Sequence, residues 1–310
     1  RYCCVHLALL ACGVGSGDEV IVQSFTFCAS SHPVTYLGAT PVFVDSEADS
    51  WNMDPVLLEE TIKDRIAKTG KKPKAIVPVH LYGMPAKIEE IMTIANKYDI
   101  PVIEDAAEGL GSRYDGQVCG TFGRYGVLSF NGNKMITTSG GGALICPDEE
   151  VKRKIMFYAT QARESYPYYQ HEEIGYNYRM SNICAGIGRG QMTVADKHIA
   201  HHRHVQALYK ELLKDVRGYC CMKLLRLIMT LISGFVQSLW ILHFASKGRK
   251  MLIRMLSRLR RWCCRCDSCR RLCYNRLPAQ RECGGFACFY AWQKNRGTSG
   301  LETDAQAAGL

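Results

Sequence analysis

Short apolar segments, two of them ending in an acidic residue, recur along the first two thirds of the chain and constrain its fold most. Residues 40–45 and 101–105 are of the acid-ended kind, and residues 75–79 are apolar throughout. Amphipathic stretches separate them, such as residues 54–67, whose apolar positions have helical spacing. Strands that are apolar on both faces and alternate with helices form a mostly parallel sheet covered by helices. The sequence therefore predicts an α/β fold, with a mostly parallel sheet between helices.

Two polar residues follow predicted strands closely enough to form a site. Ligands of such sheets bind beyond the carboxyl ends of the strands, where Asp105 is expected, and Lys134 follows the apolar segment 127–130. A pyridoxal cofactor needs a lysine amine for a Schiff base and a carboxylate that keeps its pyridinium nitrogen protonated. Taken alone, each feature more often has an ordinary explanation. Asp105 would be a helix cap or a solvated carboxylate, Lys134 a solvated side chain, and the glycines at 140–142 a turn or a close backbone approach.

In combination, these segments resemble the DegT/DnrJ/StrS family of pyridoxal 5'-phosphate (PLP)-dependent nucleotide-sugar aminotransferases. The resemblance extends from about residue 5 to residue 216. It rests on segments that occur in the family's order and spacing, at residues 38–45, 79–83, 104–111, 129–134 and 175–181. The resemblance implies the large domain of a fold-type I PLP-dependent transferase.

The resemblance assigns the central chemistry to three residues. Lys134 would bind the cofactor covalently and then carry the proton during the reaction. Asp105 would pair with the pyridinium nitrogen. Phe27 would cover the ring, although core packing is the commoner role of an aromatic residue at a strand end. A related branch of the fold carries His in place of the lysine and performs dehydration, so Lys134 favours transamination.

Three further residues have implied roles around the cofactor. Ser129 would bind its phosphate, and Glu108 would lie near its phenolic oxygen unless it is an ordinary surface carboxylate. Asn177 would reach the phosphate of the cofactor in the partner subunit, unless it is an ordinary turn residue. His80 is interpreted as a structural histidine with satisfied ring nitrogens. No metal ligand set is assigned.

The activity that the resemblance implies is transfer of an amino group to a keto-sugar carried on a nucleotide. Glutamate is the expected amino donor, and amino-sugar or polysaccharide biosynthesis is the expected context. We expect a cytoplasmic homodimer with shared active sites, without a nucleic-acid or membrane partner. A catalytically inactive fragment or pseudoenzyme of the same family, or a membrane-tethered form, is the alternative.

Charge and cysteine content change abruptly near residue 217. Residues 217–310 contain 17 Lys and Arg against 4 Asp and Glu, whereas the first 216 residues contain 22 against 25. Nine of the 16 cysteines lie in the same tail, and the other seven are scattered as in a reduced cytosolic protein. The basic character belongs to the tail, so the body gives no indication of nucleic-acid binding.

These changes divide the chain into three predicted parts. Residues 1–195 are an N-terminally truncated PLP-binding domain, residues 196–216 are a linker helix, and residues 217–310 are an aberrant tail in which the family's small domain is absent or scrambled. Residues 1–4 read Arg-Tyr-Cys-Cys where the family has a Gly-Thr-Ala-Ala-like phosphate-binding stretch. Codons for these four residues can encode Gly-Thr-Ala-Ala when they are read from the second nucleotide. Our hypothesis is that both ends are frameshifted translations of a family member.

The tail permits three other interpretations. Residues 227–245 are mostly apolar and approach the minimum length of a membrane span. Four cysteines, Cys263, Cys266, Cys269 and Cys273, have spacing suited to zinc, but the CxxC pairs overlap. Arginine-rich runs could bind phosphate backbones. The frameshift alone explains the abrupt onset, the depletion of acids and the excess of Cys and Arg together, so we rank it first.

Overall fold

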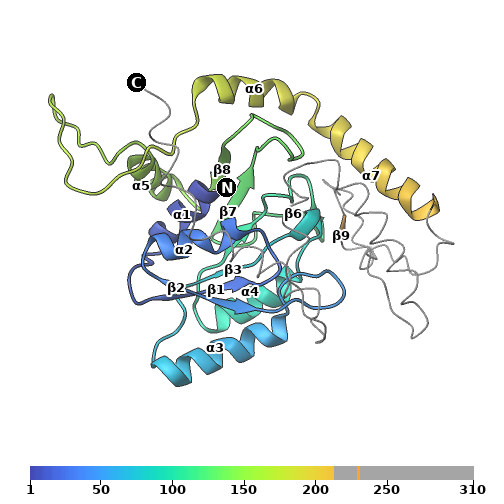
Figure 1. The fold of residues 1–310 in the computed structure, drawn as a ribbon, viewed down its shortest axis with the longest axis horizontal. Helices are drawn as coiled ribbons and strands as arrows, with labels where there is room; N and C mark the ends of the chain where they lie inside the picture. The colour runs from blue at the N-terminus through green and yellow to red at the C-terminus, as the bar shows by residue number, and fades with distance from the viewer. Residues whose placement is uncertain (213–228, 231–310) are drawn as a thin grey trace, which may run out of the picture. The chain divides into compact units, whose positions relative to one another are not determined.

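A computed structural model describes residues 1–212 and 229–230 of the chain (Figure 1). The predictions for the tail therefore lie outside the described residues, apart from the two-residue strand β9, and so does the end of the linker, 213–216. Within the described part, helices are too short or too polar to cross a membrane. The candidate span at 227–245 and the candidate zinc cysteines are not covered by that finding.

The central sheet consists of two three-stranded parts. One has the order β2-β1-β3 and the other has the order β4-β7-β8. Parallel bridges from Ile76 to Val102 and from Val79 to Asp105 connect β3 with β4. Every pair is parallel except β7 with β8, so the predicted fold class is confirmed. The strands are β1 (Glu19–Gln23), β2 (Thr40–Val44), β3 (Ala75–Val77), β4 (Ile103–Asp105), β7 (Tyr125–Ser129) and β8 (Gly142–Ile145).

Seven α-helices are described, and a small antiparallel sheet of order β6-β5-β9 accompanies them. The α-helices are α1 (Tyr2–Ala11), α2 (His32–Tyr36), α3 (Pro55–Thr69), α4 (Ile88–Lys97), α5 (Glu149–Ala159), α6 (Asn182–Met192) and α7 (Ala195–Leu212). Two 3-10 helices are η1 (Cys28–Ser30) and η2 (Leu81–Gly83), and the short strands are β5 (Arg113–Tyr114), β6 (Gln117–Val118) and β9 (Met229–Thr230).

Both faces of the inner strands β1, β3 and β4 are buried, which explains their continuous apolar residues. Val20 and Val22 of β1 pack in a core with α1 and α5, whereas Ile21 packs in a second core with α3 and α4. The two helix layers lie on opposite sides of the strands (Figure 1). Since successive side chains of a strand point to opposite faces, a strand between two cores needs apolar residues at every position.

Capping residues and proline account for several element boundaries. The Asp54 carboxylate accepts hydrogen bonds from the backbone N–H groups of Val56 and Leu57 and begins α3, which ends at Gly70 with a φ of 70°. The strand predicted at 75–79 ends at Val77, because the following Pro78 has no N–H to donate to a neighbouring strand. Helix α4 has Glu89 and Glu90 in its first turn and Lys97 in its last, which suits the helix dipole.

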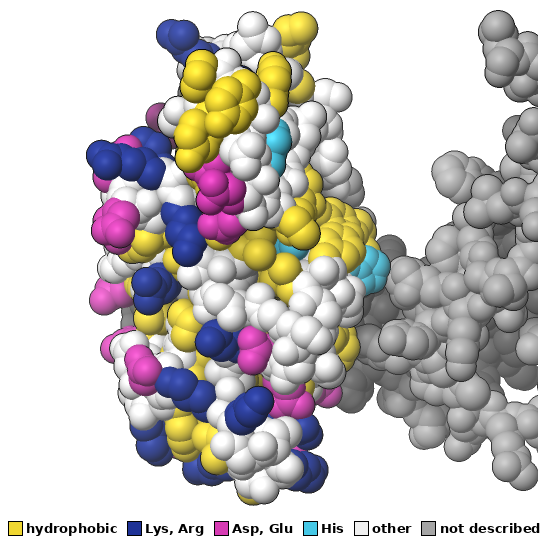
Figure 2. Space-filling model, turned by 90° about the vertical axis from the view of Figure 1, so that its left-hand side faces the viewer, with side chains coloured by type: hydrophobic (Ala, Val, Ile, Leu, Met, Phe, Trp, Pro, Cys, Tyr) yellow, Lys and Arg dark blue, Asp and Glu magenta, His cyan; other side chains and the backbone are white. Residues whose placement is uncertain are grey.

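Charged side chains of both signs cover the face shown in Figure 2. Lys and Arg lie interspersed with Asp and Glu there, and hydrophobic side chains gather toward its upper part. This distribution agrees with the nearly balanced charge of the first 216 residues.

A buried carboxylate connects β4 to the loop that precedes β7. Glu104 is fully buried, and both of its oxygens accept hydrogen bonds. Its donors are Nε2–H of His80 at 2.9 Å and the backbone N–H groups of Gly120 at 2.8 Å and of Phe122 and Gly123 at 2.6 Å. The four bonds fix the carboxyl end of β4, where Asp105 follows.

His80 is held on both ring nitrogens. Its Nδ1 accepts a hydrogen bond from the backbone N–H of Ala86 at 3.1 Å, so Nε2 carries the proton that is donated to Glu104. This arrangement agrees with the interpretation of His80 as a structural histidine. Burial acts to raise the pKa of Glu104, but the bonds from His80 and the backbone outweigh it and the pKa lies below its ordinary value.

Replacement of Glu104 by Gln should lower the free energy of unfolding by about 2–4 kcal/mol, because an amide NH₂ would face backbone donors. Urea denaturation at neutral pH measures the loss, with the exposed Glu60→Gln on α3 as a control expected within about 0.5 kcal/mol of the parent. Since the folded pKa of Glu104 is lowered, its contribution is complete above the ordinary carboxyl pKa and is lost as pH falls through the folded pKa. Equal stability of parent and Glu104→Gln would contradict this account.

Candidate active site

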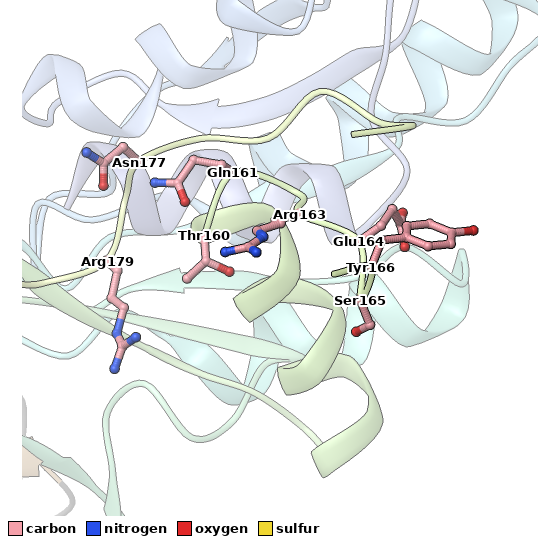
Figure 3. A pocket seen from close by; sticks show the side chains of 8 residues that line it. All are labelled: Thr160, Gln161, Arg163, Glu164, Ser165, Tyr166, Asn177 and Arg179. Carbon is pink, nitrogen blue, oxygen red and sulfur yellow. The ribbon is translucent and has the colours of Figure 1, made fainter. Parts of the chain in front are cut away.

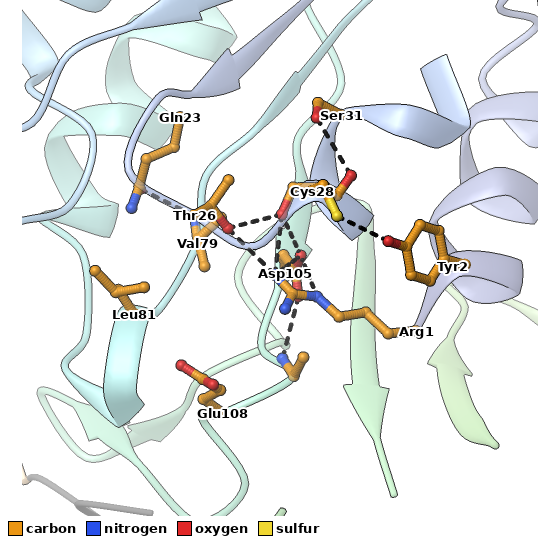
Figure 4. A network of polar contacts seen from close by, with 12 residues as sticks. Arg1, Tyr2, Gln23, Thr26, Cys28, Ser31, Val79, Leu81, Asp105 and Glu108 are labelled. Carbon is orange, nitrogen blue, oxygen red and sulfur yellow. Dashed lines mark hydrogen bonds and ion pairs between the residues drawn. The ribbon is translucent and has the colours of Figure 1, made fainter. Parts of the chain in front are cut away.

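Asp105 lies fully buried at the carboxyl end of β4, in the middle of a polar network (Figure 4). Its Oδ2 accepts hydrogen bonds from Ser30 Oγ at 2.7 Å and from Arg1 Nε and Nη2 at 2.9 and 2.6 Å. Its Oδ1 accepts the backbone N–H of Ala107 at 3.3 Å. A buried carboxylate is stable only when it is paired and hydrogen-bonded, and Arg1 provides the opposite charge.

The Arg1 guanidinium is itself enclosed, with its side chain 8% exposed. Its Nη2 also donates to Thr26 Oγ1 at 3.2 Å and to Ser30 Oγ at 3.0 Å. Its Cζ lies 5.7 Å from the centroid of the Phe27 ring, within the range of a cation–π contact. A planar cation thus lies on a buried carboxylate and beside an aromatic ring. Sequence reasoning missed this role, since residues 1–4 were considered only as a departure from the family.

Phe27 does not belong to the core. It is 59% exposed, and its ring lies edge-on to that of Tyr2 at a centroid distance of 6.2 Å. The residue follows β1 and precedes η1 in extended conformation, with φ −71° and ψ 140°. The alternative of ordinary core packing is therefore wrong, and the ring is available to cover a ligand beside Asp105.

Lys134 lies in the loop between β7 and β8, where it is held rather than solvated. Its Nζ donates to Glu108 Oε1 at 2.8 Å, and the side chains of Lys134 and Glu108 are only 10% and 23% exposed. The other Glu108 oxygen, Oε2, accepts the backbone N–H of Tyr82 at 2.8 Å. The backbone N–H of Lys134 donates to the carbonyl oxygen of Asn131 and closes the turn. The interpretation of Lys134 as a solvated side chain is therefore wrong, and Glu108 is a partly buried carboxylate with bonds to both oxygens.

The register of two strands brings the polar ends together. Asp105 of β4 pairs with Val127 of β7, and Ser129 lies two residues further along β7. Ser129 is buried at 6% exposure, and its backbone pairs with Gly142 of β8. Lys134 follows five residues later in the loop that returns to β8. The carboxyl edge of the sheet therefore collects Asp105, Ser129 and Lys134, as the parallel topology predicts.

Asn177 lies outside this network. It is exposed, forms an isolated bridge with Thr160, and borders a hollow of about 610 Å³ (Figure 3). The residues that line the hollow are Thr160, Gln161, Arg163, Glu164, Ser165, Tyr166, Asn177 and Arg179. None of them takes part in the contacts around Asp105 that are described above. Within one subunit, the contacts form two clusters: Phe27 and Asp105 meet around Arg1, and Lys134 pairs with Glu108. Ser129 lies on the strand that pairs with Asp105, and Asn177 belongs to neither cluster.

Comparison with protein families gives one match that covers most of the chain. The model of the DegT/DnrJ/EryC1/StrS aminotransferase family matches residues 3–258. The match continues past residue 216, the predicted end of the linker, and so enters the basic tail.

Comparison with individual proteins agrees. EpsN of Bacillus subtilis (strain 168), provisionally assigned as a pyridoxal phosphate-dependent aminotransferase, is 50% identical over 69% of the chain and 55% of its own length. GDP-perosamine synthase of Escherichia coli O157:H7 is 44% identical over 67% of the chain and 55% of its own length. A crystal structure of a DegT DnrJ EryC1 StrS aminotransferase from Brucella abortus has a TM-score of 0.70 at 31% identity, covering 75% of this chain and 62% of that one. The chain thus spans about half the length of these curated relatives.

Replacement of Asp105 by Asn should lower the free energy of unfolding by about 3–5 kcal/mol, because it leaves the enclosed Arg1 cation against a neutral amide. In an Arg1→Ala background the same replacement should cost markedly less, since the stranded cation is gone. A double-mutant cycle measured by urea denaturation gives the coupling. The Arg65–Glu19 pair, which is more exposed, is the matched control and should show a much weaker coupling. Equal costs in both backgrounds would show that Arg1 and Asp105 are not coupled.

Proposed function

Because the chain belongs to the DegT/DnrJ/EryC1/StrS aminotransferase family, we propose that it is a PLP-dependent enzyme that transfers an amino group to a nucleotide-linked keto-sugar. Residues 1–195 would form its PLP-binding domain. The observation that carries the proposal is the position of a held lysine, Lys134, on the same sheet edge as a buried carboxylate, Asp105. The name of the GDP-perosamine synthase relative, whose named product is GDP-linked, supports the substrate class.

The residues present fit a phosphopyridine cofactor by their chemistry. Asp105 already holds a planar cation, the Arg1 guanidinium, beside the ring of Phe27. A protonated pyridine ring is likewise a planar cation with an N–H donor. Lys134 provides an amine, and Ser129 a hydroxyl for the phosphate. The two held residues, Asp105 and Lys134, are the groups that such a cofactor requires.

Each of these side chains would have a separate task in the reaction. The bound cofactor would supply an electron sink for the carbon that loses its proton. Asp105 would keep the ring nitrogen protonated, since a buried anion stabilises a neighbouring cation. Lys134 Nζ would accept and return the proton, and Glu108 would hold the Lys134 amine in position through the 2.8 Å contact. Phe27 would cover the ring and restrict the access of water.

The amino donor in this proposal is glutamate, and the acceptor is a keto-sugar on a nucleoside diphosphate. The test is incubation of the PLP-loaded protein with L-glutamate and a GDP- or UDP-linked keto-sugar, with mass spectrometry for the amino-sugar. Formation of the amino-sugar only when glutamate is present would support both assignments. If no amino-sugar forms from the GDP-linked or from the UDP-linked substrates, the proposed activity is contradicted.

A second copy of the chain would complete the site. Helix α6 buries none of its residues, and several large apolar side chains in and before it are exposed. These are Tyr169, Ile174, Ile183, Ile187 and Met192. Such a group of exposed apolar residues is typical of a subunit interface. Asn177 lies in the same region, apart from Asp105, so it would serve the cofactor phosphate of the partner subunit.

Replacement of Lys134 by Ala should abolish the visible absorbance of the PLP-loaded protein, because the amine that would bind the cofactor covalently is lost. The exposed Lys152→Ala on α5 is the matched control and should retain the absorbance. Absorbance spectra after removal of free PLP provide the measurement. Unchanged absorbance of Lys134→Ala would refute the assignment of this lysine.

Mixing Lys134→Ala with Asn177→Ala should restore activity that neither variant has alone. Random exchange of subunits makes half of the dimers mixed, and each mixed dimer contains one site with both residues intact. About a quarter of all sites should therefore be active if the site is shared across a two-fold axis. The amino-sugar assay before and after subunit exchange measures the recovery. A mixture that stays inactive would argue against a shared site.

A further inference from the structure

Arg1 makes the contacts that the proposed cofactor ring would need. Its guanidinium donates twice to Asp105 Oδ2 and lies 5.7 Å from the Phe27 centroid. Asp105 Oδ2 also accepts Ser30 Oγ, and Oδ1 accepts a backbone N–H. Oδ2 therefore carries three donors, so a cofactor N–H that approached this oxygen beside Phe27 would meet the Arg1 guanidinium.

We propose that, in the chain with Arg at position 1, the Arg1 side chain competes with the PLP ring for Asp105 and must leave Asp105 before the ring can bind. This inference rests on the proposed cofactor binding. The guanidinium and a protonated pyridine ring have the same recognition features, which are planarity, positive charge and an N–H donor. They would use one carboxylate and one aromatic face, so binding of one excludes the other.

Lys134, the residue that would bind the cofactor covalently, is also engaged in an ion pair. Lys134 Nζ is bound to Glu108, and the pair is largely enclosed. Both charged groups that the cofactor would engage are therefore neutralised by residues of this chain. The contacts with Arg1 stabilise the buried Asp105 charge. The apparent affinity for PLP is then the intrinsic affinity multiplied by the fraction of molecules in which Arg1 has left Asp105.

The direct test is titration of the full chain with PLP, followed by equilibrium dialysis. Arg1→Ala should bind PLP about tenfold or more tightly than the parent, because the competing charge-assisted contacts are removed. Arg1→Gln, which retains a planar donor without charge, should lie between them. Arg65→Ala removes a comparable bidentate contact, with Glu19, outside the site, and should leave PLP affinity unchanged. Equal or weaker PLP binding by Arg1→Ala would overturn the inference.

A cofactor-free measurement separates the two proposals. Methylguanidinium should raise the Tm of Arg1→Ala by about 2–4 °C, because it can bind where the Arg1 guanidinium was. It should not raise the Tm of the parent or of the double variant Arg1→Ala/Asp105→Asn. If methylguanidinium raises the Tm only of Arg1→Ala, but neither the parent nor any variant binds PLP, the cofactor proposal is refuted, and the competition with it. Equal PLP binding by parent and Arg1→Ala, with no methylguanidinium effect, would refute the role of Arg1 while the proposed function stands.

Discussion

The carboxyl end of β4 carries two adjacent buried carboxylates, and the positions of the other site residues depend on them. Glu104 accepts four hydrogen bonds, including one from His80, and fixes the end of the strand. Asp105 then points to the opposite side, where it gathers Ser30 and Arg1. Burial of two neighbouring acids is costly unless each has its own donors. The structure meets that cost with separate sets of donors for the two carboxylates.

Much of this arrangement could be predicted from sequence because the signals were local. Continuous apolar strands require two covering layers, and the parallel order then places Asp105 and Lys134 on one edge. Other features depend on contacts between distant residues. The ion pairs of Arg1 with Asp105 and of Lys134 with Glu108 join side chains 104 and 26 positions apart. No periodicity or spacing encodes which of several polar residues will pair across such separations.

Element boundaries differed from expectation for reasons that are also local. Pro78 ends β3 early, and the chain rejoins β4 only through the bridge from Val79 to Asp105. This interruption falls at the sheet edge where the polar residues gather. The backbone stays bonded there, because the N–H of Asp105 donates to the carbonyl oxygen of Pro78 and the N–H of His80 donates to that of Asp105. The segment after β3 therefore still holds the carboxyl end of β4, where Asp105 lies.

Burial of both sheet faces has a consequence for how the strands find their alignment. A slip by one residue in β1 would move Ile21 into the place of Val20 or Val22, one apolar residue for another, so the cores penalise it weakly. Alignment must then be encoded by the buried polar residues at the strand ends. The Gln23 amide forms hydrogen bonds with the backbone of Phe25, Met53 and Val79 and with the side chain of Asn52. The Glu104 carboxylate likewise accepts backbone N–H groups of the loop before β7. A shifted strand would leave these buried polar groups without hydrogen-bond partners, which is costly. The polar residues at the strand ends therefore select the correct alignment of the sheet.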